Sequence, residues 1–360
     1  MTTIATTARP VDPDRLQAFL GRMVGDVGAT LSAGLVLLGD RLGLYRALAD
    51  AGPVTAAELA DLTGTSIHYL KPWLANQAAG GYVDYDPHDQ SWSLQPEQAA
   101  ALADSESPAF FAASMQLAVA TLADVDAIEE RFRTGEGFGW HEHNSGLFDG
   151  TERFFRPGYV GNLVSAWLPA LDGVLPKLAA GARVIDVGCG HGASTILMAQ
   201  AFPASTFLGV DYHPHSIQVA RRRASQAGVA DRVTFETQDA AELGSGTADL
   251  VTMFDCLHDM GDPLAAARAM HRLVGDTGTL MVVEPMAGDR VEDNLNPIGR
   301  VFYGASTLIC TPASLDQPGR RALGAQAGPT VLQGILREAG FGRVRLAATT
   351  PVNLVIEARH

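Results

Sequence analysis

Glycines and one acid lie at alternate positions in a short stretch whose spacing could form a ligand site. The sequence RVIDVGCGHG, residues 183–192, joins a β-branched run to Gly188, Gly190 and Gly192. Such glycines let the backbone approach a ligand closely, and a helix that begins there offers free N–H groups. The order G-x-G-x-G differs from the G-x-G-x-x-G of dinucleotide sites, and Asp186 before it suits a ligand that carries an ammonium group.

Further acids end the strands expected after this motif. The run 206–211 ends in Asp211, where a doubly wound fold brings a carboxylate to ribose hydroxyls. The next two runs end at Asp239 and Asp255. Each acid could simply cap its strand end. Four acids in succession instead favour a nucleoside site along one edge of a sheet.

The elements that must position these residues alternate through the second half of the chain. Helices are expected over 216–227 and 263–273, between β-branched strands, and this alternation is typical of a parallel sheet. The runs 343–350 and 353–359 would form an antiparallel final pair. We therefore predict an α/β, doubly wound cofactor-binding domain over residues 181–360.

The first part of the chain has a different order of elements. Helices are expected over 31–48, from a capping box at Thr55 to Gly64, and over 67–80, followed by a small hairpin. This is the order of a winged helix. The third helix carries a single basic residue, Lys71, which argues against reading DNA. Residues 1–105 are predicted to be a winged-helix-like unit for packing or dimerisation.

A helical bridge is expected over residues 106–180, contributing to a substrate pocket. It contains the segment GEGFGWHEHNSG, which bears Trp140, His141 and His143. Alternation over three residues supplies at most two metal ligands, so no metal is expected. The segment is either a pocket wall or an interdomain turn, and the sequence leaves this open. Residues 294–315 lack a clean period and are interpreted as a substrate lid containing Tyr303.

Composition limits the partners. The chain has 360 residues, with 26 Lys and Arg against 40 Asp and Glu, a net charge of -14 that disfavours nucleic acid. Its 3 cysteines show no disulfide or zinc spacing. No basic leader with an apolar core is seen, and no run approaches the roughly 20 apolar residues that span a bilayer. A cytoplasmic protein without a membrane partner is expected.

The motifs VIDVGCGHG, GVDYHP, QDAAEL and FDCLHDMGDP together resemble those of class I S-adenosylmethionine-dependent methyltransferases. With the winged-helix front end, the chain is similar to small-molecule O-methyltransferases and to a poorly characterised bacterial branch with HGAST and CLHDMGDP. The resemblance implies a seven-stranded methyltransferase sheet and S-adenosyl-L-methionine as cofactor. It also implies a small hydrophobic or aromatic substrate, and we expect a homodimer.

The resemblance also assigns roles to individual residues. It implies that His258 is the general base for a substrate hydroxyl and that Glu284, at the end of the next strand, orients it. The remaining roles concern the two ligands. The methionine end of the cofactor would meet Asp186, Gly188 and Gly190; the ribose, Asp211; the adenine, Asp239 with Ala240; the near wall, Asp255 with Cys256; and the substrate, Trp140, His141 and Tyr303. Tyr212 would also bind the cofactor.

Several alternatives stay open from the sequence. His258 and Asp259 could merely cap their loop while Glu284 ends a strand. The chain could be a winged-helix regulator that senses S-adenosylmethionine, or an enzyme that keeps the cofactor without methylating. The identity of the acceptor, and whether its reacting atom is oxygen, nitrogen or carbon, is not written in the sequence.

Overall fold

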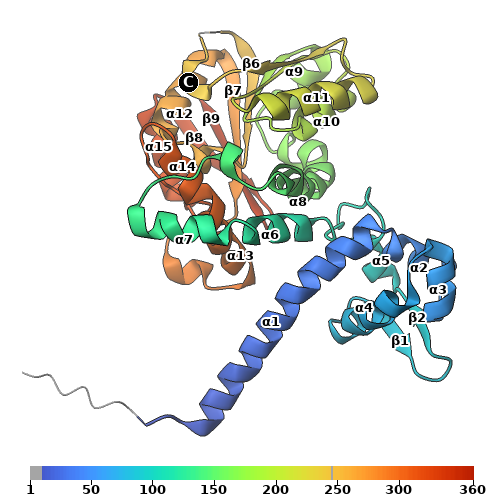
Figure 1. The fold of residues 1–360 in the computed structure, drawn as a ribbon. Coiled ribbons are helices and arrows are strands. Elements are labelled where there is room, and N and C mark those ends of the chain that lie inside the picture. The colour runs from blue at the N-terminus through green and yellow to red at the C-terminus, as the bar shows by residue number, and fades with distance from the viewer. Residues whose placement is uncertain (1–9, 245) are drawn as a thin grey trace, which may run out of the picture. The chain divides into compact units, whose positions relative to one another are not determined.

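The computed structural model describes residues 10–244 and 246–360, which form two compact units. One unit extends to Val119 and the other runs from Ala120 to His360. Each unit has its own hydrophobic core. Figure 1 shows the helices and strands of both units.

The first unit is helical with a small hairpin, in the order expected for a winged helix. Its elements are α1 (Pro13–Arg41), α2 (Leu44–Ala51), α3 (Ala56–Thr63), α4 (Ile67–Ala79), β1 (Asp84–Asp86), β2 (Ser91–Ser93) and α5 (Pro96–Leu102). The helical pattern expected over 31–48, with Gly43 as an interruption, is two helices, because Gly43 has a φ of 69° and separates α1 from α2. Asp12 caps α1, whose first residue is Pro13, so this helix starts well before the expected position.

Helix α1 leaves an apolar stripe uncovered. Only its last third contributes buried side chains, such as Val36 and Leu37. By length and hydropathy α1 could cross a bilayer, and among the described helices it alone meets this test, which buried core helices also pass. The exposed apolar side chains of its first part are Leu16, Phe19, Leu20, Met23, Val24, Val27 and Leu31.

The second unit contains a seven-stranded sheet, as predicted. Its strands are β3 (Arg183–Val187), β4 (Thr206–Asp211), β5 (Val233–Thr237), β6 (Ala248–Phe254), β7 (Val274–Pro285), β8 (Arg343–Thr349) and β9 (Asn353–Arg359). The spatial order is β5-β4-β3-β6-β7-β9-β8. The first five strands in this order are parallel, and β9 is antiparallel to both β7 and β8. The expected antiparallel final pair is thus confirmed.

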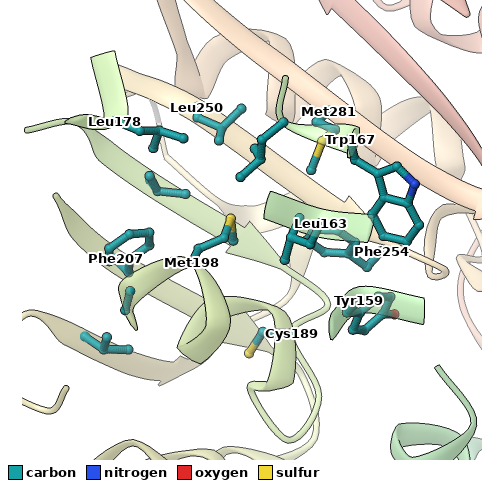
Figure 2. Packing of buried hydrophobic residues seen from close by; sticks show 14 of the residues in the cluster. Tyr159, Leu163, Trp167, Leu178, Cys189, Met198, Phe207, Leu250, Phe254 and Met281 are labelled. Atoms are coloured by element: carbon teal, nitrogen blue, oxygen red, sulfur yellow. The ribbon is translucent and has the colours of Figure 1, made fainter. Parts of the chain in front are cut away.

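Alternate residues of the central strands fill two cores on opposite faces of the sheet. Val184 and Leu250 pack on one face with helices α10 (Ala193–Ala201) and α11 (Pro214–Gln226). Ile185 and Val251 pack on the other face with α12 (Pro263–Leu273) and α15 (Pro329–Glu338). Figure 2 shows the first core, where Tyr159, Leu163 and Trp167 adjoin Phe254 at the end of β6. A sheet buried on both faces explains the near-continuous apolar strands.

The remaining helices contain two π turns. The elements are α6 (Ser114–Leu122), α7 (Val125–Thr134), α8 (Gly146–Asn162), α9 (Val174–Ala180), α13 (Pro297–Ala305) and α14 (Thr311–Asp316). A π turn, Ser306–Cys310, joins α13 to α14, and another, Leu163–Trp167, follows α8. A π turn shifts the phase of the helical repeat, which explains why residues 294–315 lack a clean period.

Candidate functional site

A pocket of about 480 Å³ opens at the carboxyl ends of the parallel strands in the second unit. Its wall is built from the glycine loop after β3, the ends of β4 and β6, the turn after β5, and α8. The wall is completed by Trp140, Asp259, Met260, Asp262, Ala265, Ala266 and residues 317–319. This is the edge of an open α/β sheet at which ligands bind.

The glycine loop is shaped by backbone conformations that only glycine adopts easily. Gly188, Gly190 and Gly192 have φ values of 71°, 51° and 79°. A Cβ on Gly188 would lie 2.7 Å from the Cys256 sulfur, whereas a Cβ on Gly190 would meet no atom within 4 Å. The loop is therefore packed tightly at its start and open at Gly190, which lines the pocket.

Asp186 lies behind the pocket wall and is fully buried, not on the wall itself. One carboxylate oxygen accepts from the hydroxyls of Ser194 and Thr195, and the other accepts from Thr252 at 2.8 Å. Burial raises the pKa of Asp186, while these three hydrogen bonds oppose the shift. This side chain therefore contacts the start of α10, directly after the glycine loop.

Asp211 and Tyr212 are both on the wall. The Asp211 carboxylate accepts from the backbone N–H of Gly190 at 2.9 Å and from that of His213 at 2.8 Å. Burial raises the pKa of Asp211. This acid joins the glycine loop to the end of β4, and each of its oxygens keeps a further lone pair for a ligand.

Asp239 and Ala240 also line the pocket. Asp239 accepts from the backbone N–H of Ala241 at 2.8 Å and so begins the 3-10 turn Ala240–Glu242. Asp239 therefore caps this turn, and it also lies on the pocket wall.

Asp255 is held in an unusual backbone conformation at the end of β6. Its φ is 50°, a value that a non-glycine residue adopts at some cost and that is found often at functional sites. Its carboxylate accepts from the Tyr159 hydroxyl at 2.9 Å and from the Asn353 amide at 3.1 Å. Burial, and then the charge of Glu284, raise the pKa of Asp255 well above its usual range. Asp255 and Cys256 both line the pocket.

His258 and Glu284 are brought together as the resemblance implies, but beneath the wall. His258 Nδ1 contacts the Glu284 carboxylate, whose other oxygen accepts from the Leu257 N–H at 2.9 Å. The two residues are 3% and 1% exposed, and neither lines the pocket. Asp259 does line it, and its Oδ1 lies 3.1 Å from His258 Nε2. Asp259 therefore separates the imidazole from the pocket.

Two carboxylates determine the charge of His258. Burial alone would lower the pKa of this imidazole, but the charges of Asp259 and Glu284 outweigh burial and raise it well above the usual value. The buried thiol of Cys310 lies in the same group, in which one nitrogen, oxygen and sulfur atom all lie within 4.8 Å of one another. Within this group the imidazole contacts both carboxylates directly.

Of the three residues expected on the substrate side, Trp140 lines the pocket, together with Phe148 and Phe155. His141 and Tyr303 do not line it. Trp140–Glu142 forms a 3-10 turn, in which successive side chains point about 120° apart, so His141 is exposed. Tyr303 is half-buried on α13.

Sequence reasoning missed four residues of the site: Tyr159, His191, Asp259 and Asn353. Tyr159 and Asn353 lie 96 and 98 positions from Asp255, and nothing local in the sequence marks them. His191 and Asp259 stand inside motifs that the sequence analysis quoted, and only their burial and neighbours distinguish them.

Two family descriptions match the chain. Residues 178–320 match a family described as "Methyltransferase domain", and residues 30–104 match one described as "Rv2258c-like winged HTH domain". The 27-O-demethylrifamycin SV methyltransferase of Amycolatopsis mediterranei is 33% identical over 179 residues, covering 48% of this chain and 57% of its own. The ubiquinone biosynthesis O-methyltransferase of Pseudomonas aeruginosa is 36% identical over 104 residues, covering 29% and 44%. The chain thus spans about half the length of these relatives.

Solved structures share the fold over nearly the whole chain. Human N-acetylserotonin methyltransferase, in complex with SAM, superposes with a TM-score of 0.69 at 18% identity, covering 98% of this chain and 99% of its own. The mitomycin 7-O-methyltransferase MmcR gives 0.65 at 22% identity, covering 96% and 100%. At these identities the likeness concerns the fold alone.

Proposed function

Because the chain joins a winged helix-turn-helix domain to a methyltransferase domain, we propose that it transfers a methyl group from S-adenosyl-L-methionine to a small molecule. The acceptor we propose is a hydroxyl of a hydrophobic or aromatic metabolite. The observation that carries the proposal is one pocket whose wall combines the open glycine loop, the acids at the ends of three strands, and aromatic side chains.

The pocket residues fit this cofactor. Open space at Gly190 allows the methionine part to approach the backbone. Asp211, with lone pairs left over, would accept from the ribose hydroxyls, and Asp239 with Ala240 would hold the adenine. Tyr212 and Asp255 with Cys256 would close the site, and Asp186 would act from behind by holding the loop. When bound, the sulfonium supplies an electrophilic methyl group.

The substrate would lie on the aromatic side of the pocket. Trp140, Phe148 and Phe155 offer apolar surface next to Asp259, the acid in front of His258. Methyl transfer needs chiefly that the nucleophile and the methyl carbon be held in near-attack geometry. A flat, apolar acceptor with one hydroxyl aimed at Asp259 satisfies this arrangement.

We propose that His258, oriented by Glu284, takes the substrate proton through the Asp259 carboxylate. Two carboxylates face the imidazole and raise its pKa, which favours its charged form before the cofactor binds. A positively charged sulfonium in the same pocket would lower the pKa of His258 by like-charge repulsion. His258 would then release its proton to solvent and could accept the substrate proton in its place.

A regulator that only senses the cofactor is less well supported. Sensing the cofactor does not require a buried histidine between two carboxylates beneath the pocket wall. Helix α4 bears one Lys, Lys71, and no Arg. A single cationic side chain is too few for contacts with the phosphates of DNA.

We also propose a cytoplasmic homodimer formed through the first unit. The apolar stripe on α1 is larger than isolated surface leucines would explain. A second copy offers the same stripe, so two α1 helices could cover each other symmetrically. The alternative is that the stripe binds a membrane, and measurements of mass and of vesicle binding distinguish the two.

Turnover tests the proposed function. The full chain is incubated with S-adenosylmethionine and a panel of phenolic and hydroxylated metabolites, and the demethylated cofactor is measured by mass spectrometry. We expect a substrate-dependent rise together with a product heavier by one methylene. Release of demethylated cofactor without a methylated product would contradict the proposal.

A further inference from the structure

His191, in the glycine loop, is buried with both ring nitrogens unused. It is 5% exposed, and neither Nδ1 nor Nε2 has a hydrogen-bond partner among the described residues. The Asp149 carboxylate forms an ion-pair contact with it: Oδ1 lies 3.6 Å from Nδ1, and the Asp149 side chain is 58% exposed. A buried polar atom without a hydrogen-bond partner costs free energy. An unsatisfied group of this kind therefore indicates a site where a ligand or a water molecule binds.

The position of His191 favours a negatively charged ligand group. It lines the pocket and directly precedes helix α10, whose N-cap is Gly192. The N-terminus of a helix carries a partial positive charge and free N–H groups. An anion beside His191 would therefore meet this helix end as well.

The rest of the wall offers an anion little else. None of the described lining residues is Lys or Arg, and the acidic residues there include Asp211, Asp239 and Asp255. The other histidine on the wall, His213, is already engaged: its Nδ1 contacts the Ser216 hydroxyl at 2.9 Å, and its ring stacks on Phe148 at 4.6 Å. Of the two histidines, His191 alone has its nitrogens free.

We infer that His191 is the residue that binds the carboxylate of the cofactor's amino-acid part. This inference rests on the proposed function, because it concerns the same cofactor. An imidazole N–H donates to the carboxylate, and the start of α10 adds its partial charge. Burial, and then the nearby Arg223, lower the pKa of His191 to about 4, so the ring enters the contact neutral, as a donor from one nitrogen.

Calorimetry with two ligands tests this inference. S-Adenosylhomocysteine carries the carboxylate, and its decarboxylated analogue keeps the adenosine, the thioether and the ammonium group. For His191→Ala we expect the affinity for S-adenosylhomocysteine to fall about 10- to 100-fold, the range of a hydrogen bond to a charged group. The affinity for the decarboxylated analogue should stay within about twofold of the parent value, because this analogue lacks the carboxylate that His191 would bind.

Two further variants sharpen the result. His191→Gln keeps an N–H donor and should recover part of the loss. His68→Ala, on an exposed histidine of α4, should change neither affinity.

The outcomes separate the two proposals. Equal binding of S-adenosylhomocysteine by His191→Ala and the parent overturns the inference, as does an equal loss for both ligands, which would mean that His191 is structural. If both His191 variants lose the analogue as well, the inference also fails. If the parent binds neither ligand, the cofactor proposal itself has failed.

Discussion

At the residue scale, the chemistry that we propose depends on three side chains in a row from the pocket inward, Asp259, His258 and Glu284. Their contacts place the imidazole between two carboxylates and beneath the wall. We therefore assign His258 a role in proton transfer through Asp259. Substitutions and pH can separate this role from a structural one.

Replacing His258 with alanine should lower kcat by about 100- to 10,000-fold, the usual contribution of general-base assistance. The affinity for S-adenosylhomocysteine should be nearly unchanged, because His258 does not line the pocket. Glu284→Gln should lose less, since the glutamate only orients the ring. Steady-state rates and calorimetry on the same preparations provide the measurement, and a His258→Ala enzyme that turns over at the parent rate from about pH 6 to 9 would make the histidine structural.

The pH dependence of kcat/KM should follow His258. The neutral imidazole is the active form, and its pKa is raised in the enzyme without cofactor, so kcat/KM for S-adenosylmethionine should rise with pH through a midpoint above the ordinary histidine value. Glu284→Gln removes one of the carboxylates that raise this pKa, so the midpoint should move to lower pH. A midpoint that stays in place in this variant would assign the titration to another group.

At the element scale, the glycine loop and the strand ends are the parts that the sequence predicted well. The motif of Gly188 and Gly190 gave the loop, and period and turn residues gave the order of strands and helices. The sequence could not place His258 beneath Asp259, because that depends on how residues 256–261 turn. It also could not show that Tyr159 and Asn353 hold Asp255, since these contacts join segments nearly 100 positions apart.

The π turns explain why the sequence shows no helical period over residues 294–315. This segment, interpreted as a substrate lid, contains the helices α13 and α14, which are joined by the turn Ser306–Cys310. One inserted residue changes which side chains share a face. A pattern with a single period therefore cannot predict which face of the segment carries Tyr303, and its role at the substrate stays a prediction.

A single methyl group tests the loop as an element. Gly188→Ala puts a Cβ 2.7 Å from the Cys256 sulfur at a φ of 71°, so the loop must shift and cofactor affinity should be lost. Gly135→Ala has the same φ of 71° but no atom within 4 Å, so it carries only the backbone strain of about 1 kcal/mol or more. Thermal unfolding and calorimetry on both variants check this. Equal binding by the two variants would show that the tight start of the loop is not needed.

At the scale of the whole molecule, the apolar stripe on α1 predicts a homodimer. Light scattering at micromolar concentration should give twice the mass of the chain. Leu20→Glu with Val24→Glu should give the monomer, since each charge would be buried at the interface. Leu62→Glu, at an equally exposed leucine of α3, should remain dimeric. A parent protein that is monomeric and cosediments with lipid vesicles would assign the stripe to a membrane.

The central claim is that the pocket binds S-adenosylmethionine, and calorimetry with its demethylated product, with NAD as competitor, tests this most directly. The account predicts one saturable site for S-adenosylhomocysteine and no comparable binding of NAD. Asp211→Asn should weaken binding about tenfold or more through its ribose hydrogen bonds, while Asp276→Asn at an exposed position should not. Tighter binding of NAD than of S-adenosylhomocysteine, or unchanged affinity in Asp211→Asn, would contradict the account.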